Sequence, residues 1–413
     1  MKDKLIKVIG AGVGGVDVSS EHIKWADLLV GGERLLKEIN SSKEKLLIKG
    51  SIKDVLRRIA VAIKEGKKVL VVSDGDPLFF GIGKRMIQEF GKECVEIHPN
   101  VTVSQVACAR LGIPFDEIKV VSIHGKKEFF SVLSALMQSD IVGIYTDGAE
   151  GPKRIAKELL KREIRDFFMI VLEELETDKE RIREFKKIEH VLEEDFFDLN
   201  FAVLRRISGS KHTLKIGMDD SFYRHERGLI TKKEIRVISI SKLELKSDST
   251  VWDIGAGCGS VGIECSCISK EGRIFCIEKE LKRFYMIKEN IKRAGAYIVE
   301  AICGKAPDCL KELPSADRVF VGGGLSEDPL MLEHISRYMK QDGIIVINIA
   351  LIENLANVLA FIKEKGWEFE LTQVMISRSH PIGKSTALTP LNPIFIIKVE
   401  RRSKNVVKDR KEK

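Results

Sequence analysis

The sequence predicts two successive α/β domains, the second of which is a doubly wound, Rossmann-like sheet. Three observations lead to this fold class. The chain has 413 residues, which is more than one ordinary domain of roughly 100 to 200 residues holds. Short β-rich runs alternate with helical stretches along the chain. Two of those runs, at residues 5–10 and 250–255, lead directly into glycine-rich turns.

In the first half, strand and helix signals alternate from Lys4 to about Arg205. Each predicted strand is a short run rich in Val, Ile, Leu or Phe, bounded by turn-forming or charged residues. These runs are residues 5–10, 26–32, 68–77, 93–99, 119–125, 140–148, 166–175 and 201–207. A polar stretch at residues 208–228 then breaks the periodicity. We therefore predict a first domain at residues 1–207, a linker at 208–220 and a second domain at 221–400.

The second half alternates more cleanly. The predicted elements are a helix at 232–243, a strand at 250–255, a helix at 261–269, a strand at 273–278, a helix at 281–296, strands at 297–303 and 318–323, a helix from Pro329, a strand at 343–350, a helix from Glu353, and strands at 369–378 and 393–400. Strands that alternate with crossover helices predict a doubly wound sheet, which the last two strands close as a hairpin. The basic run at 401–413 is expected to be a solvated, disordered tail.

Composition narrows the class of protein. Hydrophobic residues make up 44% of the chain, but no apolar run approaches the ~20 residues that a membrane span needs. With no signal-like start, we expect a soluble, cytoplasmic protein. The eight cysteines include no C-x-x-C pair, so we expect reduced thiols and no metal site. The net charge of +8 suits either a nucleic acid or a polycarboxylate substrate.

The second glycine turn, "VWDIGAGCGSVG", points to a nucleotide-like cofactor. A nicotinamide fingerprint that begins at Gly255 requires a glycine at position 260, where this chain has Ser260. The pattern D-x-G-x-G-x-G, with Gly255, Gly257 and Gly259, instead resembles the S-adenosylmethionine loop of Rossmann-like methyltransferases. Glu278 ends the next predicted strand, 23 residues after Gly255, where a carboxylate can accept from both ribose hydroxyls.

The segment after the fourth strand of this domain argues against nucleic-acid substrates. It reads "DRVFVGGGLSE", without the N/D-P-P-Y element that holds an exocyclic amine, and no proline precedes a cysteine anywhere in the chain. An RNA methyltransferase that uses the second domain and the basic tail stays open as the alternative.

The first glycine turn, "KVIGAGVGGVD", matches G-x-G-x-x-G at Gly10, Gly12 and Gly15. The carboxylate of Glu33 follows at about the sequence spacing that a ribose-binding residue would need. A nicotinamide-binding unit also needs a crossover helix of about ten or more residues before its second strand. Only residues 19–26 are available, so this turn is expected to serve another fold.

The sequence segments "GDPLFFGIG", "ARLGIPFDE" and "SIHG" in the first half resemble the corresponding segments of the tetrapyrrole methylases that act on precorrins. The stretch from "GMDDSFYRHERG" to "GAGCGSVGIE" resembles the partner methyltransferase domain. Their order is similar to that of the fused precorrin-6Y methyltransferase (decarboxylating) family. The family's proline in the first loop is absent, and its P-G-x-S-S turn reads "PNVTV". We expect Asn100 to tolerate a positive φ there and Thr102 to keep a hydroxyl.

The resemblance implies an S-adenosylmethionine-dependent methylation of a precorrin or cobalt-precorrin at carbons 5 and 15. It also implies decarboxylation of an acetate side chain, in corrin-ring (cobalamin) biosynthesis. The first domain is expected to methylate carbon 5, and the second to methylate carbon 15 and to decarboxylate. Two S-adenosylmethionine sites per chain and a homo-oligomer are expected, without a nucleic-acid partner, membrane or metal.

The resemblance also implies the site residues. The expected cofactor contacts of the second domain are Thr231, Gly255, Ala256, Gly257, Cys258, Gly259, Glu278 and Ala306. Those of the first domain are Gly12, Gly75, Asp76 and Thr102, although Asp76 is equally suited to form the turn before Pro77. Substrate-binding candidates are Arg378, Lys384 and His124, each weighed against an ordinary surface or structural role. No catalytic acid or base is assigned, because the sulfonium methyl needs no activation.

Overall fold

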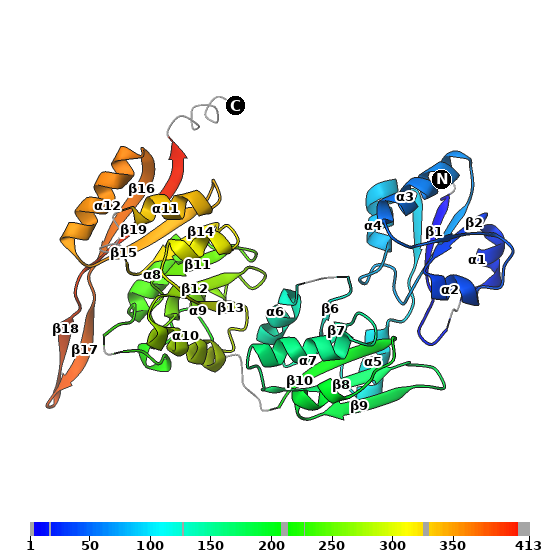
Figure 1. Ribbon diagram of the computed structural model, residues 1–413, viewed down its shortest axis with the longest axis horizontal. Coiled ribbons are helices and arrows are strands. Elements are labelled where there is room, and N and C mark those ends of the chain that lie inside the picture. Colours follow the sequence, from blue (N-terminus) through cyan, green and yellow to red (C-terminus); the bar gives the residue numbers. More distant parts are fainter. Residues whose placement is uncertain are drawn as a thin grey trace. The chain divides into compact units, whose positions relative to one another are not determined.

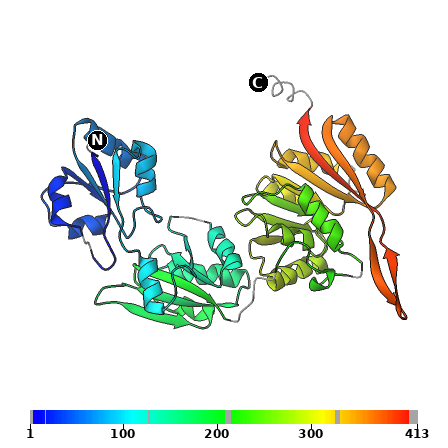
Figure 2. The same ribbon diagram turned by 180° about the vertical axis from the view of Figure 1, so that it is seen from behind.

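The structure is a computed structural model that describes residues 4–15, 18–125, 128–207, 214–226, 228–324 and 330–403. The chain forms two compact units, residues 1–209 and 210–413. Figure 1 labels their helices and strands, and Figure 2 shows them from behind. None of the helices in the described ranges is long and apolar enough to cross a membrane.

Unit 1 (residues 1–209) is built on two five-stranded sheets. Its strands are β1 (Ile6–Gly10), β2 (Leu28–Gly31), β3 (Glu44–Leu47), β4 (Val69–Ser73), β5 (Val95–His98), β6 (Lys119–Ser122), β7 (Ile141–Tyr145), β8 (Phe167–Glu173), β9 (Arg181–Phe185) and β10 (Asn200–Arg206). The first sheet has the order β3-β2-β4-β1-β5 and is parallel throughout. The second has the order β6-β7-β10-β8-β9, and only β6 and β7 run parallel in it.

Short helices connect these strands. They are α1 (Ser20–Trp25), α2 (Glu33–Glu38), α3 (Ile52–Lys64), α4 (Gly83–Phe90), α5 (Val103–Leu111), α6 (Phe130–Gln138), α7 (Gly151–Lys161) and a 3-10 helix, η1 (Ile188–Glu193). The six residues of α1 are too few for the crossover of a dinucleotide-binding unit, as the sequence predicted. In addition, β1 has β4 and β5 as its neighbours and not β2, so its glycine turn does not open such a unit.

Unit 2 (residues 210–413) contains a seven-stranded sheet of order β13-β12-β11-β14-β15-β19-β16 and a separate two-stranded sheet, β17-β18. The strands are β11 (Val251–Ile254), β12 (Ile274–Glu278), β13 (Val299–Cys303), β14 (Arg318–Val321), β15 (Ile344–Ile349), β16 (Trp367–Val374), β17 (Ser377–Ile382), β18 (Ser385–Pro390) and β19 (Ile394–Ser403). The helices are α8 (Lys233–Lys242), α9 (Ser260–Cys265), α10 (Leu281–Ala294), α11 (Met331–Tyr338), α12 (Ile352–Glu364) and the 3-10 helices η2 (Asp220–Phe222) and η3 (Asp308–Glu312).

The first five strands of this order are parallel. The chain runs outward from β11 to β13 on one side and continues through β14 and β15 on the other. The strand order therefore reverses between β11 and β14, and ligands of open α/β sheets bind beyond the carboxyl ends of the strands at such a point.

Both faces of the large sheet are covered by helices, as a doubly wound sheet requires. On one face, Trp252 and Ile254 of β11 pack in a buried cluster with residues of α11 and α12. On the other face, Asp253 contacts the start of α9, and α8 and α10 pack alongside it. The alternation of β11 residues between two buried faces explains why its sequence is apolar throughout except at Asp253.

The C-terminal part of unit 2 contains more strands than the two that the sequence predicted. Residues 369–378 do not form one strand, because β16 ends at Val374 and β17 begins at Ser377. Met375, which lies between them, is 75% exposed. The sequence prediction treated this apolar residue as part of one continuous strand. Residues 377–385, which contain Arg378 and Lys384, form β17, the turn after it and the first residue of β18. Strand β19 lies between β15 and β16 and is antiparallel to both.

The predicted linker and tail also differ in extent from the structure. The main-chain N–H groups of Gly217 and Met218 donate to the buried carboxylate of Glu264 at 2.7 and 3.1 Å, so the end of the 208–220 stretch is fixed to unit 2. Strand β19 continues to Ser403, which is beyond the start of the predicted tail at 401. Residues 404–413 lie outside the described residues.

Candidate functional site

The turn between β11 and α9 requires glycine at three positions. Gly255, Gly257 and Gly259 have φ angles of +68°, +58° and +78°, a region that side chains disfavour. A Cβ atom on Gly255 would lie 2.9 Å from the nitrogen of Gly323, and one on Gly259 would lie 3.0 Å from Ile287. On Gly257 the nearest atom would be 3.9 Å away. Gly255 and Gly259 thus allow close packing, whereas Gly257 keeps open space in front of the backbone.

A buried carboxylate supports this turn from behind. Asp253 is 1% exposed, and its Oδ2 accepts a hydrogen bond of 2.8 Å from the N–H of Gly262. Removal from water, reinforced by the nearby negative charge of Glu278, raises the pKa of Asp253 to about 7. The residue does not line the cavity, so its role is to hold β11 and α9 together.

A second carboxylate faces the turn from the neighbouring strand. Glu278 is the last residue of β12 and is 5% exposed. Its Oε2 accepts from the N–H of Gly257 at 2.9 Å, and its Oε1 accepts from the N–H of Glu280 at 3.0 Å. Each carboxylate oxygen has a further lone pair, so Glu278 can accept hydrogen bonds from a ligand while both backbone bonds persist.

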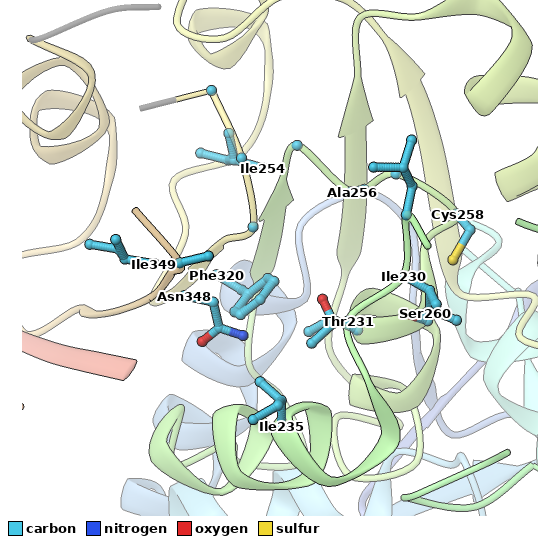
Figure 3. A pocket seen from close by; sticks show the side chains of 18 of the residues that line it. Ile230, Thr231, Ile235, Ile254, Ala256, Cys258, Ser260, Phe320, Asn348 and Ile349 are labelled. Atoms are coloured by element: carbon cyan, nitrogen blue, oxygen red, sulfur yellow. The ribbon is translucent and has the colours of Figure 1, made fainter. Parts of the chain in front are cut away.

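These groups open into a cavity of about 800 Å³ at the carboxyl ends of β11, β12, β14 and β15. Figure 3 shows its wall, to which helix α8 contributes from below. Labelled residues of that wall are Ile230, Thr231, Ile235, Ile254, Ala256, Cys258, Ser260, Phe320, Asn348 and Ile349. Basic side chains also line it, from Lys232, Lys279, Arg283 and Lys305. A mostly apolar wall with a few polar groups is typical of small-molecule sites.

One polar group in this wall has no partner. The Nδ2 atom of Asn348, on β15, is buried without a hydrogen bond, while its Oδ1 accepts from the hydroxyl of Ser239 at 3.0 Å. Figure 3 shows the amide beside the ring of Phe320. Leaving a buried donor unpaired is unfavourable by about 1–3 kcal/mol, so a ligand that fills this part of the cavity is expected to pair with it.

The glycine turn of unit 1 contacts two other loops. Gly10, at the end of β1, lies so close to the carbonyl of Gly75 and to Asn100 that a Cβ atom would collide with both. The side chain of Asn100 donates to the carbonyl of Gly10 at 3.1 Å. The expectation that Asn100 takes a positive φ is wrong, because it is not among the residues with that conformation. Its side chain, and not its backbone, joins the loops.

Thr102 and Asp76 each have a local structural partner. Thr102 is the N-cap of α5 and forms a capping box with Gln105. Its hydroxyl also lies 2.9 Å from that of Ser104. Asp76 accepts from the N–H of Leu78 at 2.7 Å, which is the turn-forming role that the sequence left open. Gly12 has a φ of +85°, and a Cβ on Gly75 would meet Thr102 at 3.2 Å.

The structure brings most of the predicted contacts of unit 2 together. Those that line the cavity are Thr231, Gly255, Ala256, Gly257, Cys258, Glu278 and Ala306. Gly259 does not line it and packs against α10 instead. Binding by any of these residues, and by Gly12, Gly75, Asp76 and Thr102 in unit 1, stays a prediction.

The three substrate-binding candidates lie elsewhere. Arg378 forms ion pairs with Glu234 at 2.6 Å and with Asp220 at 3.1 Å, and it does not line the cavity. Lys384 is exposed at the turn of the β17–β18 hairpin. The side chain of His124 is 79% exposed and lies 3.2 Å from Asp147. A substrate contact by Arg378 stays a prediction, and it would require the exchange of both ion pairs.

Sequence reasoning missed Phe320, Asn348 and Lys305. A polar residue within the otherwise apolar run "GIIVINIA" was a usable signal for Asn348. Lys305 is the second residue after β13, and none of the ion pairs found among the described residues involves it. Its position in the wall of the cavity depends on the sheet order, which the sequence does not fix.

The cysteines do not suggest metal chemistry. All eight are free thiols in the structure, and burial raises the pKa of Cys265 and Cys276 well above the usual value. Among the described residues, no group of three or more His, Cys, Asp or Glu side chains is placed to hold a metal ion.

The sheet order, the glycine turn and the acidic end of β12 define unit 2 as a Rossmann-like domain of the methyltransferase class. Residues 7–189 match the family of Tetrapyrrole (Corrin/Porphyrin) Methylases, and residues 221–401 match the Precorrin methyltransferase domain. A Sinorhizobium protein named precorrin-6Y C(5,15)-methyltransferase [decarboxylating] is 29% identical over 404 residues, which is 94% of each chain.

Shorter relatives match less than half of this chain. A Pyrobaculum calidifontis protein, named a probable cobalt-precorrin-6B C(15)-methyltransferase (decarboxylating), is 37% identical over 181 residues, covering 43% of this chain and 92% of that protein. The solved structure of a precorrin-6y C5,15-methyltransferase from Geobacter metallireducens is 34% identical, with a TM-score of 0.43, and covers 45% of this chain and 97% of that chain. The chain belongs to the precorrin-6Y C5,15-methyltransferase (decarboxylating) family.

Proposed function

We propose that this protein is an S-adenosylmethionine-dependent methyltransferase that methylates a precorrin or cobalt-precorrin at carbons 5 and 15 and decarboxylates one acetate side chain, in cobalamin biosynthesis. The observation that carries the proposal is the cavity of unit 2, where the buried carboxylate of Glu278 and the glycines Gly255 and Gly257 line one end. The likeness to the Sinorhizobium protein over 94% of the chain supports the substrate class and the presence of both activities.

The residues of unit 2 suit this cofactor. Glu278 offers free lone pairs to the two ribose hydroxyls, and its bond to Gly257 fixes its orientation. The absence of a Cβ at Gly257 lets the chain of the cofactor approach the main-chain N–H groups. Thr231, Ala256, Cys258 and Ala306 complete the cofactor side of the wall.

The chemistry requires alignment more than acid–base catalysis. When bound, S-adenosylmethionine supplies an electrophilic methyl group, and a bridging carbon of a reduced tetrapyrrole is an enamine-like nucleophile. Ile235, Ile254 and Phe320 line the cavity, and their proposed role is to exclude water from the space between the two. The protein then has to hold the reacting atoms in line at roughly 3 Å.

The substrate half of the cavity is proposed to lie toward β14 and β15, beyond the cofactor turn. There the unpaired amide of Asn348 offers a hydrogen-bond donor. A precorrin also carries many carboxylates, and Lys305 at the cavity wall offers a positive charge to one of them. Decarboxylation breaks the bond between the acetate methylene and its carboxylate, carbon dioxide leaves, and the methylene carbon takes a proton to become a methyl group.

Unit 1 is proposed to hold the second S-adenosylmethionine and to methylate carbon 5. Three loops meet there, at Gly10, Gly75 and Asn100, and the left-handed Gly12 leaves its backbone open. A homo-oligomeric state, a cytoplasmic location and the absence of a nucleic-acid partner stay predictions.

The test is to incubate the full chain with S-adenosylmethionine and precorrin-6Y, with and without cobalt, and to weigh the products. We expect two added methyl groups and the loss of one carbon dioxide. A parallel reaction with RNA tests the alternative: methylated RNA together with an unchanged precorrin would overturn the proposal.

A further inference from the structure

Phe80 in unit 1 combines an unfavourable backbone with an exposed ring. Its φ is +55°, which is an uncommon conformation for a bulky residue, and the residue is 55% exposed. Burial of the ring therefore does not compensate for the backbone conformation. Such outliers persist where the surroundings fix them, and they cluster at functional sites.

The other non-glycine residues with positive φ in the described ranges have ordinary explanations. Glu163 follows the end of α7 and Glu244 follows the end of α8, where a left-handed residue terminates a helix. Glu174 and Glu176 form the turn between β8 and β9. Phe80 lies in the loop between β4 and α4 and ends no helix.

The loop fixes Phe80 from both sides. Before it, Asp76 accepts from the N–H of Leu78, as described above. After it, the N–H of Gly83 donates to the carbonyl of Pro77 at 2.8 Å. A Cβ atom on Gly81 would lie 2.5 Å from that same carbonyl, so the chain wraps tightly around Pro77. The loop gives Phe80 little freedom to relax.

The ring of Phe80 belongs to an aromatic row. Its centroid lies 4.8 Å from that of Phe79 and 5.6 Å from that of Tyr145, and Tyr145 lies 5.2 Å from Phe201. The hydroxyl of Tyr145 is 3.2 Å from that of Ser104, at the start of α5. Phe80 is thus the exposed end of a row that reaches the second sheet of unit 1 through Tyr145 of β7 and Phe201 of β10.

The loop that carries Phe80 starts next to the proposed cofactor turn, because Gly10 and Gly75 are in close backbone contact. The loop of Phe80 begins at Gly75, which meets Thr102 closely. Two further apolar residues on these loops are exposed, Leu78 at 53% and Val101 at 49%. Exposed apolar side chains on loops that meet in close backbone contact favour a binding surface for an apolar, flat partner.

We propose that the Phe80 ring is the surface on which the conjugated face of the tetrapyrrole lies during methylation by unit 1. The inference rests on the proposed function and names the residue of unit 1 that positions the substrate. The strained backbone holds the ring outward, and the row through Tyr145 and Phe201 keeps it from turning. Phe80 is a substrate-positioning residue and takes no part in the transfer of protons or of the methyl group.

The test uses the full chain carrying Phe80→Gly, which removes both the ring and the strain. With precorrin-6Y as the probe, we expect KM for methylation at carbon 5 to rise about tenfold, while kcat changes less. The affinity of unit 1 for S-adenosylmethionine should stay the same. The midpoint of thermal unfolding should not fall, because glycine tolerates the left-handed conformation. Phe80→Tyr, which keeps the ring, should restore KM.

Phe115→Gly is the matched control, since Phe115 is a similarly exposed phenylalanine of unit 1, at 42%, and does not have a positive φ. It should leave KM unchanged. An unchanged KM in Phe80→Gly would overturn the inference, as would a loss of cofactor affinity in place of substrate affinity. A failure of the proposed function is distinguishable, because the unmodified protein would then make no methylated precorrin at all.

Discussion

Oε2 of Glu278 accepts a 2.9 Å hydrogen bond from the main-chain N–H of Gly257, so the end of β12 is joined to the turn that follows β11. The bond ties the group proposed to hold the ribose to the loop proposed to hold the rest of the cofactor. Because the two residues are 21 positions apart in the sequence, only the parallel pairing of β11 with β12 brings them together.

Glu278→Ala should weaken the binding of S-adenosylmethionine to unit 2 by about ten- to a hundredfold, since a hydrogen bond to a charged group contributes about 1.5–3 kcal/mol. Methylation at carbon 15 and decarboxylation should fall together at limiting cofactor. Calorimetry and product mass measure both effects. Glu280→Ala is the control, because Glu280 is an exposed neighbour that does not line the cavity. Normal release of carbon dioxide by Glu278→Ala would contradict the assignment to unit 2.

Gly255→Ala should destabilise unit 2 more than Gly257→Ala does. Both positions have a positive φ, so alanine at either position lowers the free energy of unfolding by about 1 kcal/mol or more, because its Cβ disfavours the left-handed backbone. Only at Gly255 does the new Cβ also meet a backbone atom, at 2.9 Å. Urea unfolding of the two variants measures the difference. Equal losses of stability would show that the contact with Gly323 relaxes without penalty.

Asp253 predicts a pH dependence of stability. Its pKa rises from 3.8 to about 7 in the folded protein, so the folded state holds the proton more tightly than the unfolded chain does. The contribution of Asp253 to stability is therefore lost as the pH rises from about 4 to about 7, and it is flat above that range. Unfolding measured across this range should show the unmodified protein losing stability relative to Asp253→Asn. The exposed Asp248→Asn should show no such relative change.

Titration of the full chain with S-adenosylmethionine should give two molecules bound per chain, one in each unit. The glycine turns of the two units belong to different folds, so neither site depends on the other. Glu278→Ala should reduce the stoichiometry toward one at moderate cofactor concentration. A value of one for the unmodified protein would mean that the departures in "GVGGVD" and "PNVTV" have closed the site of unit 1.

Asn348→Leu should raise KM for the precorrin and leave the affinity for S-adenosylmethionine unchanged. The substitution removes the unpaired amide from the proposed substrate half of the cavity. Stability should change by less than about 1 kcal/mol, because the lost bond to Ser239 is offset by removal of a buried, unpaired polar atom. Ser239→Ala, which removes that bond and the bond of the hydroxyl to the carbonyl of Ile235 but keeps the amide, serves as the comparison. A fall in cofactor affinity for Asn348→Leu would place the amide in the cofactor half instead.

The sequence predicted the central strands and missed two of the strands at sheet edges. Strands such as β4 and β11 are buried along their length, so their apolar runs stand out. The missed strands β3 and β9 lie at sheet edges, and each buries one residue, Leu46 and Phe185. An edge strand with one apolar face position has no alternation long enough to recognise.

What the sequence determined by itself is local: the glycine turns, the acidic strand end at Glu278, the two α/β halves and the family. These features depend on the spacing of residues within one strand–turn–helix segment. What only the tertiary structure decided is which distant residues share a site. Sheet order placed Asn348 and Lys305 in the wall of the cavity, and ion pairs with Glu234 and Asp220 engaged Arg378 outside it. The physical reason is that strand pairing and side-chain packing join segments that are a hundred or more residues apart. The sequence pattern of one segment does not specify which other segments will lie next to it in space.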